Sequence, residues 1–167
     1  EALSILSQDD YFIRCLCKHL SNTELSRLSG DITDFKKYCS DLYIPLEEKP
    51  EYDIDIVLVK GPPQSGKTNY ICNAFYEFSE AERKSLFFRA KSIKNGVISY
   101  LKEHVLGYLD ATTNTAEKVT NNIISRGDVT IFIDGLNEVT RNERDDIICD
   151  IERIAAFNVN FVVSCTD

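Results

Sequence analysis

Residues 61–68, GPPQSGKT, follow directly on a run rich in β-branched residues. Gly61, Gly66, Lys67 and Thr68 match the pattern G-x-x-x-x-G-K-[ST], whose glycines let backbone N–H groups curl around a phosphate. A helix that begins there adds the positive end of its dipole. In such a loop the lysine ammonium reaches the β- and γ-phosphates, and the threonine hydroxyl ligates Mg²⁺. The pattern therefore predicts a binding loop for a nucleoside triphosphate and its magnesium ion.

We expect the whole loop and the start of the following helix to contact the nucleotide. The predicted contact residues are Gly61, Pro62, Pro63, Gln64, Ser65, Gly66, Lys67, Thr68 and Asn69. The alternative is an ordinary glycine turn beside a surface lysine. An apolar strand before the loop and an amphipathic helix after it favour phosphate binding, because a loop of this type needs both neighbours.

A second group of polar residues follows the apolar run 128–134, DVTIFID. In a protein with a phosphate-binding loop, a carboxylate such as Asp134 at the end of a second strand holds Mg²⁺, directly or through water. Glu138, four residues later, is placed to orient the attacking water or accept its proton, whereas Asn137 is neutral and cannot act as a base. The alternative for Glu138 is a solvated loop acid. Glu138 and Lys67 are thus the predicted catalytic residues.

From residue 54 onward the pattern alternates between strand and helix. Strands are predicted over 54–60, 85–88, 128–134 and 160–165, and helices over 68–79, 93–109, 115–127 and 140–157. This alternation predicts an α/β fold with a parallel sheet covered on both faces. Ligands bind such sheets at the carboxyl ends of the strands. The loops after Lys60 and after Ile133 should therefore meet at one edge of the sheet.

Residues 1–50 are expected to form a helical N-terminal segment and a linker. Apolar residues recur at helical spacing over 8–20, namely Phe12, Leu16 and Leu20. Ser21 and Glu24 have the spacing of a capping box, which predicts that a second helix begins there. A third short helix is predicted from residue 31, ending before Pro45, and a polar linker follows it.

Length and charge limit the classes of function. The chain has 167 residues, which is enough for one domain with a sizeable core. Its formal net charge is −8, from 19 basic and 27 acidic residues, which disfavours nonspecific binding to nucleic acid. No apolar run approaches the ~18 residues of a membrane-spanning helix. The first residue is Glu1 and the last residues follow directly on an apolar run, so we expect a segment of a longer protein.

The six cysteines show no CxxC pair and no spacing typical of a metal site. Cys72, Cys149 and Cys165 have apolar neighbours and are predicted to be buried, reduced thiols of a cytosolic protein. His19 and His104 are far apart in the sequence and are expected on helix surfaces.

Together, GPPQSGKT and the later stretch IFIDGLNEV resemble the NACHT family of STAND-type P-loop ATPases. The places of the family's second motif are occupied by Asp134, Gly135, Asn137 and Glu138. At the place of Asn137 the family more often has an acid. The resemblance covers residues 51–167. It implies an α/β P-loop NTPase core of the ASCE or AAA+-like type, with a parallel sheet flanked by helices. This core would be truncated before its lid, and the N-terminal helical segment would precede the core.

The stretch NFVVSC resembles the strand that leads to the sensor motif of this family. An arginine often follows that strand in the family, but Cys165, Thr166 and Asp167 occupy these places here.

The resemblance further implies a cytoplasmic signalling switch. Members hold ADP when quiet, exchange it for ATP when triggered, and assemble into oligomers. This chain would accordingly bind ATP or ADP with Mg²⁺, hydrolyse ATP slowly and self-associate, with sensor and effector domains outside the segment. A role in innate immunity or antiviral defence is expected from the resemblance alone.

Three other functions remain open from the residues. A P-loop kinase would need a basic lid, for which RNER at 141–144 is a candidate, although the apolar stripe after it favours a helix start. A GTPase would need an Asn-Lys-x-Asp loop, which the sequence does not contain. A nucleotide-binding module without catalysis would leave Glu138 inert.

Overall fold

Four parallel strands form the sheet at the centre of the structure, which is a computed structural model describing residues 5–6, 8–29 and 55–166. The strands are β1 (Ile56–Lys60), β2 (Lys84–Arg89), β3 (Val129–Asp134) and β4 (Asn160–Cys165). The helices are α2 (Asp10–Ser29), α4 (Lys67–Glu80), α5 (Gly96–Leu109), α6 (Thr113–Ser125) and α7 (Arg141–Ala155). Short 3₁₀ turns cover Ala90–Ser92 and Leu136–Glu138.

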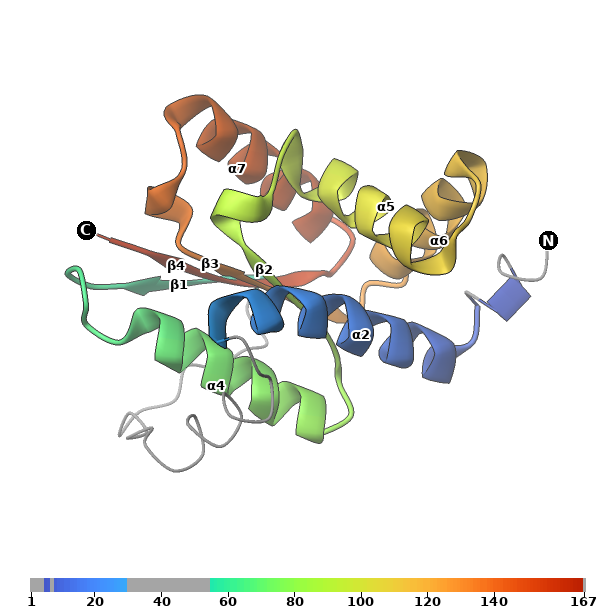
Figure 1. The fold of residues 1–167 in the computed structure, drawn as a ribbon, viewed down its shortest axis with the longest axis horizontal. Coiled ribbons are helices and arrows are strands. Elements are labelled where there is room, and N and C mark those ends of the chain that lie inside the picture. The colour runs from blue at the N-terminus through green and yellow to red at the C-terminus, as the bar shows by residue number, and fades with distance from the viewer. Residues whose placement is uncertain (1–4, 7, 30–54, 167) are drawn as a thin grey trace.

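Helices cover both faces of the sheet (Figure 1). Helices α5, α6 and α7 lie on one face, α4 lies on the other, and α2 packs along β2. The prediction of an α/β fold with a parallel sheet flanked by helices is confirmed. Burial on both faces explains the nearly continuous apolar runs of the inner strands, since neither side of these strands meets water.

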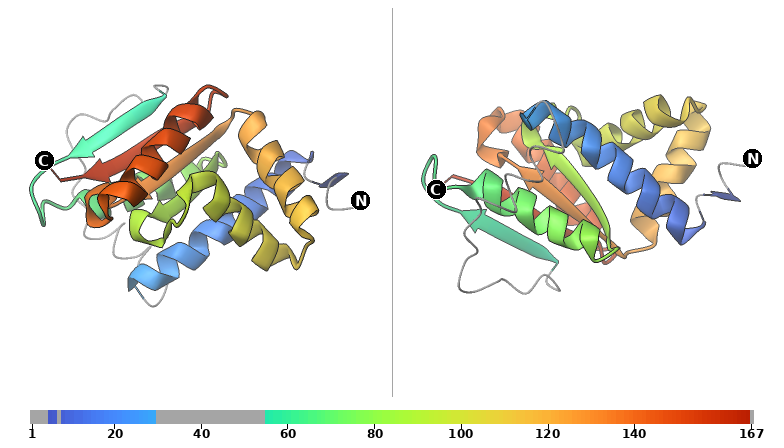
Figure 2. Two further views of the ribbon diagram at one scale, coloured as in Figure 1. Left: turned by 90° about the horizontal axis from the view of Figure 1, so that it is seen from above. Right: turned by 60° about the horizontal axis from the view of Figure 1, so that its bottom comes forward.

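The strand order is β1-β4-β3-β2, and every neighbouring pair is parallel. Strand β4 therefore separates β1, which leads into the glycine-rich loop, from β3, which ends in Asp134. Figure 2 shows β1 at one edge of the sheet with β4 beside it. Because of this order, residues at the carboxyl end of β4 lie between the two loops of chemical interest.

Alternate residues of β2, β3 and β4 supply two separate cores. Beneath α5, α6 and α7 the sheet contributes Leu86, Phe88, Ile131, Ile133, Phe161 and Val163. On the α4 side, Phe75 of the helix meets Phe87 and Phe132 edge-to-face, with ring centroids 5.8 Å apart in both contacts. Edge-to-face contacts of this kind contribute about 0.5–1.5 kcal/mol beyond the area that the rings bury. The aromatic contacts fix α4, and with it the start of the helix at the glycine-rich loop.

The N-terminal segment differs from the prediction at Ser21, because α2 is one continuous helix and no capping box forms there. Ser21 Oγ donates to the carbonyl of Cys17 at 2.7 Å, the bond that a serine inside a helix makes to the preceding turn. The same oxygen accepts the backbone N–H of Phe87 at 3.0 Å. Strand β2 lies at the edge of the sheet, so α2 covers an edge that would otherwise present unpaired backbone groups.

Glu24, the other half of that expected box, is fully buried. Its Oε1 accepts a hydrogen bond of 2.8 Å from the hydroxyl of Tyr100 on α5, and its Oε2 lies 3.6 Å from Arg89 Nε at the end of β2. A buried carboxylate needs such partners, because desolvation without them is costly. Glu24 therefore joins α2 to the sheet and to α5 instead of beginning a helix.

The second predicted capping box is confirmed. Thr140 Oγ1 accepts the N–H of Glu143 at 3.4 Å, and Glu143 Oε2 accepts the N–H of Thr140 at 3.1 Å, at the start of α7. Helix α5 begins at Gly96, slightly later than predicted, and an acid from another helix caps it: Asp150 Oδ2 accepts the N–H of Ile98 at 3.0 Å.

The predicted burial of the cysteines is confirmed for Cys72 and wrong for Cys149, which lies on the exposed side of α7. Cys165 is half-buried. The short helix expected between residue 31 and Pro45 and the linker after it lie outside the described residues. Among the described helices, none is long and apolar enough to cross a membrane.

Candidate functional site

The glycine-rich loop bends back on itself between β1 and α4. Gln64 and Gly66 adopt left-handed backbone conformations, with φ of 62° and 83°. At Gly61 an added Cβ would lie 2.9 Å from Ser65 Oγ, so the serine side chain would have to rotate away to make room for it. The loop thus uses glycine where a phosphate-binding curve needs it, and α4 begins at once with Lys67.

The side chain of Lys67 lies across this loop. Its Nζ donates to the carbonyl oxygens of Gly61 at 2.9 Å and Pro62 at 2.7 Å. An ammonium group has three donors and no acceptor, so it can exchange these carbonyls for phosphate oxygens without a change of charge state. Lys67 is therefore positioned to bind a phosphate group with its ammonium group.

Thr68 and Asp134 meet directly, although they come from different elements. Thr68 Oγ1, in the first turn of α4, donates to Asp134 Oδ2 at 3.0 Å. Asp134 is only 8% exposed. Its other oxygen, Oδ1, accepts a hydrogen bond of 2.6 Å from Ser164 Oγ at the end of β4. Both oxygens of the carboxylate are thus held by hydroxyl groups from two neighbouring elements.

These oxygens fit the preferences of Mg²⁺. The ion takes hard oxygen ligands, keeps several waters, and is usually held by one or two protein groups together with substrate phosphates. A threonine hydroxyl and one carboxylate beside a phosphate-binding loop are such a set. Among the described residues, no group of three or more His, Cys, Asp or Glu side chains could hold a metal by itself.

The loop after β3 turns sharply at Gly135, whose φ is 79°. A Cβ at this position would lie 3.0 Å from Glu138 Cδ. The N–H of Glu138 donates to the carbonyl of Gly135 at 2.8 Å, which closes a short 3₁₀ turn. Because of this turn, Glu138 is exposed on the same side as the glycine-rich loop. Asn137 Oδ1 accepts the N–H of Thr166 at 2.9 Å, so the loop is also tied to the chain beyond β4.

One cavity of about 450 Å³ unites these groups. Residues 63–69 of the glycine-rich loop line it, and so do Asp134, Gly135, Asn137 and Glu138 of the second loop. Two predicted contact residues lie outside this lining, Gly61 and Pro62, which hold Lys67 through their carbonyls.

Sequence reasoning missed two residues of this cavity, Ser164 and Thr166 at the end of β4. The signal available for Ser164 was a polar residue at the end of the apolar run NFVVSC. Its position next to Asp134 depends on the strand order, and no local pattern gives that order.

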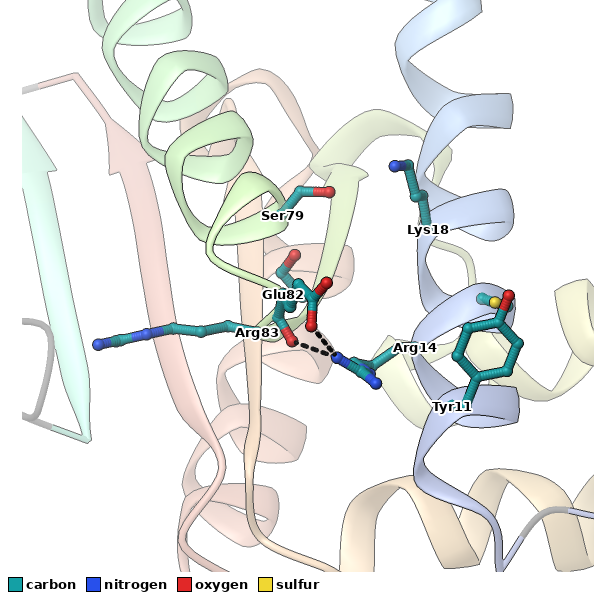
Figure 3. A pocket seen from close by; sticks show the side chains of 8 residues that line it. Tyr11, Arg14, Lys18, Ser79, Glu82 and Arg83 are labelled. Carbon is teal, nitrogen blue, oxygen red and sulfur yellow. Dashed lines mark hydrogen bonds and ion pairs between the residues drawn. The ribbon is translucent and has the colours of Figure 1, made fainter.

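A second pocket, of about 250 Å³, lies between α2 and the turn after α4 (Figure 3). Tyr11, Arg14 and Lys18 line one side, and Glu82 binds Arg14 from the other side with a distance of 2.8 Å between Nη1 and Oε2. The 14 residues of α4 span about 20 Å, which separates this pocket from the glycine-rich loop. It is no part of the candidate site.

No protein-family model matches the sequence, and no curated protein matches it either. Among solved structures, a DNA replication initiation factor is similar with a TM-score of 0.43 and 12% identity, over 85% of this chain and 38% of that one. PCH-2 from C. elegans is similar with a TM-score of 0.37 and 16% identity, over 96% of this chain and 36% of that one. The chain thus spans less than two fifths of the length of either structure. At this level of similarity, function has to be argued from the site itself.

Proposed function

We propose that this chain is the nucleotide-binding core of a Mg²⁺-dependent ATPase that works as a signalling switch of the NACHT/STAND type. The observation that carries the proposal is the 3.0 Å hydrogen bond between Thr68 Oγ1 and Asp134 Oδ2, in a cavity that Lys67 and Glu138 also line. A hydroxyl, a buried carboxylate and an ammonium beside a glycine-rich loop form the constellation that P-loop proteins use for a triphosphate with magnesium.

In this proposal, backbone N–H groups of residues 63–69 and the amino end of α4 bind the phosphates. Lys67 would leave the carbonyls of Gly61 and Pro62 for the β- and γ-phosphate oxygens. Thr68 and Asp134 would hold Mg²⁺, which neutralises charge that develops on the phosphates. Positioning and charge stabilisation of this kind account for most of the catalysis of phosphoryl transfer.

Glu138 is the group proposed to orient the attacking water and accept its proton. It is exposed toward the cavity, and the Gly135 turn fixes its backbone. Asn137 is a neutral amide and cannot act as a base, and its side-chain oxygen accepts the backbone N–H of Thr166. With a single acid in reach of the water we expect slow hydrolysis, as suits a switch.

The resemblance to the NACHT family supports the finer parts of the proposal. Residues 51–167 would form the core and residues 1–50 a preceding helical segment. The state of the bound nucleotide would control self-association of the full-length protein in the cytoplasm. Sensor and effector parts would lie outside this segment, in a role such as immune or antiviral defence. A formal net charge of −8 makes nucleic acid an improbable partner of this segment.

The kinase alternative has no support from the cavity. Arg141 and Arg144, the basic residues considered for a lid, belong to the first turn of α7 and do not line the nucleotide cavity. The side chain of Arg141 is 92% exposed beside Asp145. No observation in the described residues favours phosphate transfer to a small molecule.

Nucleotide binding and single-turnover hydrolysis test the proposal. Fluorescent analogues of ATP, ADP and GTP are titrated with Mg²⁺, and hydrolysis of labelled ATP is followed with excess protein. Lys67→Ala should lose nucleotide affinity, and Glu138→Gln should bind ATP but not hydrolyse it. The matched controls are Lys118→Ala and Glu103→Gln, which alter exposed side chains outside the cavity.

Two results would contradict the proposal. Lys67→Ala that binds nucleotide as tightly as the parent protein would exclude the phosphate-binding role of the loop. Glu138→Gln that hydrolyses ATP at the parental rate would exclude Glu138 as the catalytic base and leave the binding role intact.

A further inference from the structure

Ser164 holds the carboxylate of Asp134 from the strand that lies between the two loops. It is 1% exposed at the carboxyl end of β4. Its Oγ donates to Asp134 Oδ1 at 2.6 Å and accepts the backbone N–H of Gly135 at 2.8 Å. One hydroxyl therefore binds both the side chain at the end of β3 and the first backbone group of the turn that follows.

Only a hydroxyl side chain can make these two bonds at once in such a small space. A serine hydroxyl carries one donor hydrogen and accepts through its lone pairs, whereas alanine offers neither. Without them, a buried carboxylate oxygen and a buried N–H would lose their partners, which is costly for a group away from water.

The strand order places Ser164 directly beside Asp134. In the register of β3 and β4, Ile133 lies beside Val163, so Asp134 and Ser164 are the next residues on each strand. On the opposite side, Thr68 of α4 binds the other carboxylate oxygen. Asp134 is thus held between β4 and α4, and the two contacts together set the plane of its carboxylate.

We infer that Ser164 is a positioning residue for the proposed magnesium site: it fixes Asp134 so that Oδ2 faces Thr68 Oγ1, and fixes the Gly135 turn that presents Glu138. This inference rests on the proposed function. Mg²⁺ demands nearly ideal octahedral geometry, so a ligand that can rotate binds it less well. Groups that orient metal ligands typically change metal affinity or activity about 10- to 100-fold when they are removed.

A purely structural role for Ser164 predicts something different. Loss of a buried hydrogen bond would lower the stability of the whole protein and leave the magnesium requirement unchanged. A positioning role predicts that the concentration of Mg²⁺ needed for ATP binding and hydrolysis rises, while nucleotide affinity without metal stays the same. The glycine-rich loop and Lys67 supply that metal-free affinity, and the hydrogen bonds of Ser164 go to Asp134 and Gly135 instead.

The test compares Ser164→Ala, Ser164→Thr and the parent protein. Magnesium titrations are read by binding of a fluorescent ATP analogue and by single-turnover hydrolysis, and binding is repeated in EDTA. For Ser164→Ala we expect the half-maximal Mg²⁺ concentration to rise at least about 10-fold, with affinity in EDTA unchanged within about 2-fold. Ser164→Thr keeps the hydroxyl and should restore the parental Mg²⁺ requirement. Thr130→Val is the matched control, because it removes a buried hydroxyl near the amino end of β3.

A parental Mg²⁺ requirement in Ser164→Ala overturns the inference, and so does an equal loss of affinity in EDTA. If the alanine variant does not fold, Ser164→Cys takes its place, since a thiol is a weaker donor and acceptor and should also raise the requirement. A parent protein that binds no nucleotide with Mg²⁺ refutes the proposed function and this inference with it. If the parent protein binds and hydrolyses ATP and Ser164→Ala has the same Mg²⁺ requirement, only this inference is refuted and the proposed function stands.

Discussion

The hydroxyl of Thr68 and the carboxylate of Asp134 lie 3.0 Å apart, although the two residues are 66 positions apart in the chain. Parallel strands with helical crossovers produce this contact. Strand β1 delivers the glycine-rich loop and β3 delivers the acid, both at the carboxyl edge of one sheet. The contact gives the candidate site its chemistry, and it leads to the first prediction.

Asp134→Asn should abolish magnesium-dependent hydrolysis and spare metal-free binding of nucleotide. An amide carries no charge for Mg²⁺ and turns one ligand oxygen into a donor group. We expect the single-turnover rate to fall at least about 100-fold. A residue that only orients a metal ligand changes activity by up to about 100-fold, and a ligand itself should matter at least as much. Asp145→Asn, on the exposed side of α7, should leave the rate unchanged. A variant that keeps the parental rate at the parental Mg²⁺ concentration would remove Asp134 from the site.

Gly135→Ala should destabilise the protein, and Gly107→Ala should not. Gly135 has a φ of 79°, and a Cβ there would press on Glu138. Strain of this kind costs about 1–3 kcal/mol. Gly107 lies inside α5 with nothing within 4 Å of its added Cβ, so alanine there should stabilise the helix by about 0.5–1 kcal/mol. Urea denaturation measures the free energy of unfolding of both variants. Equal changes for the two substitutions would contradict the strain argument.

Tyr100→Phe should weaken the attachment of α2. The tyrosine hydroxyl donates to the fully buried carboxylate of Glu24, and a hydrogen bond to a charged group contributes about 1.5–3 kcal/mol. We expect the free energy of unfolding to fall by that amount and the amide protons of α2 to exchange faster. Tyr108→Phe, on the same helix but 48% exposed, is the control and should have little effect. Unchanged exchange in α2 would mean that this bond does not hold the helix.

The described cysteines should differ sharply in their reactivity. Cys17 is buried in α2, and burial raises the pKa of its thiol to about 12. Because the thiolate is the reactive form, Cys17 should resist iodoacetamide at pH 8 in the native protein. Cys15 and Cys149 are exposed and should be alkylated, while buried Cys72 should be protected. Mass spectrometry of the labelled peptides, native and in urea, checks the order. Rapid native labelling of Cys17 would show that α2 leaves the sheet readily.

Stability should decline in acid partly through Glu143. A hydrogen bond from Lys94, together with hydrogen bonds from Thr140, lowers the pKa of Glu143 from 4.5 to about 2. A folded-state pKa below the unfolded value contributes stability above the unfolded pKa, and this contribution disappears as the pH falls from about 4.5 toward 2. Thermal melts across this range should show a shallower pH dependence for Glu143→Gln than for the parent protein. The ion pair of Lys94 and Glu143 lies at the surface, with side chains 59% and 27% exposed, so the difference should be small and should shrink in high salt.

Local patterns in the sequence determined most of the secondary structure. Apolar runs marked all four strands, three of them with β-branched residues, and helical spacing marked α4 to α7. The Thr140–Glu143 capping box could be read correctly because both of its bonds are made within one turn. The glycine-rich loop and the acid at the end of β3 were also visible, since each is a contiguous motif. Their assignment to nucleotide, metal and catalysis remains a prediction.

The tertiary structure decided what these patterns could not. Ser21 and Glu24 have the spacing of a helix start, yet an edge strand and a buried tyrosine give them better partners inside one long helix. Ser164 gained its place beside Asp134 because β4 lies between β1 and β3. The spacing of residues along a chain predicts helix caps and the apolar faces of helices and strands, because these form within a few residues. Strand order depends on how the crossovers pack, and so the partners of a buried polar group become known only in the folded chain.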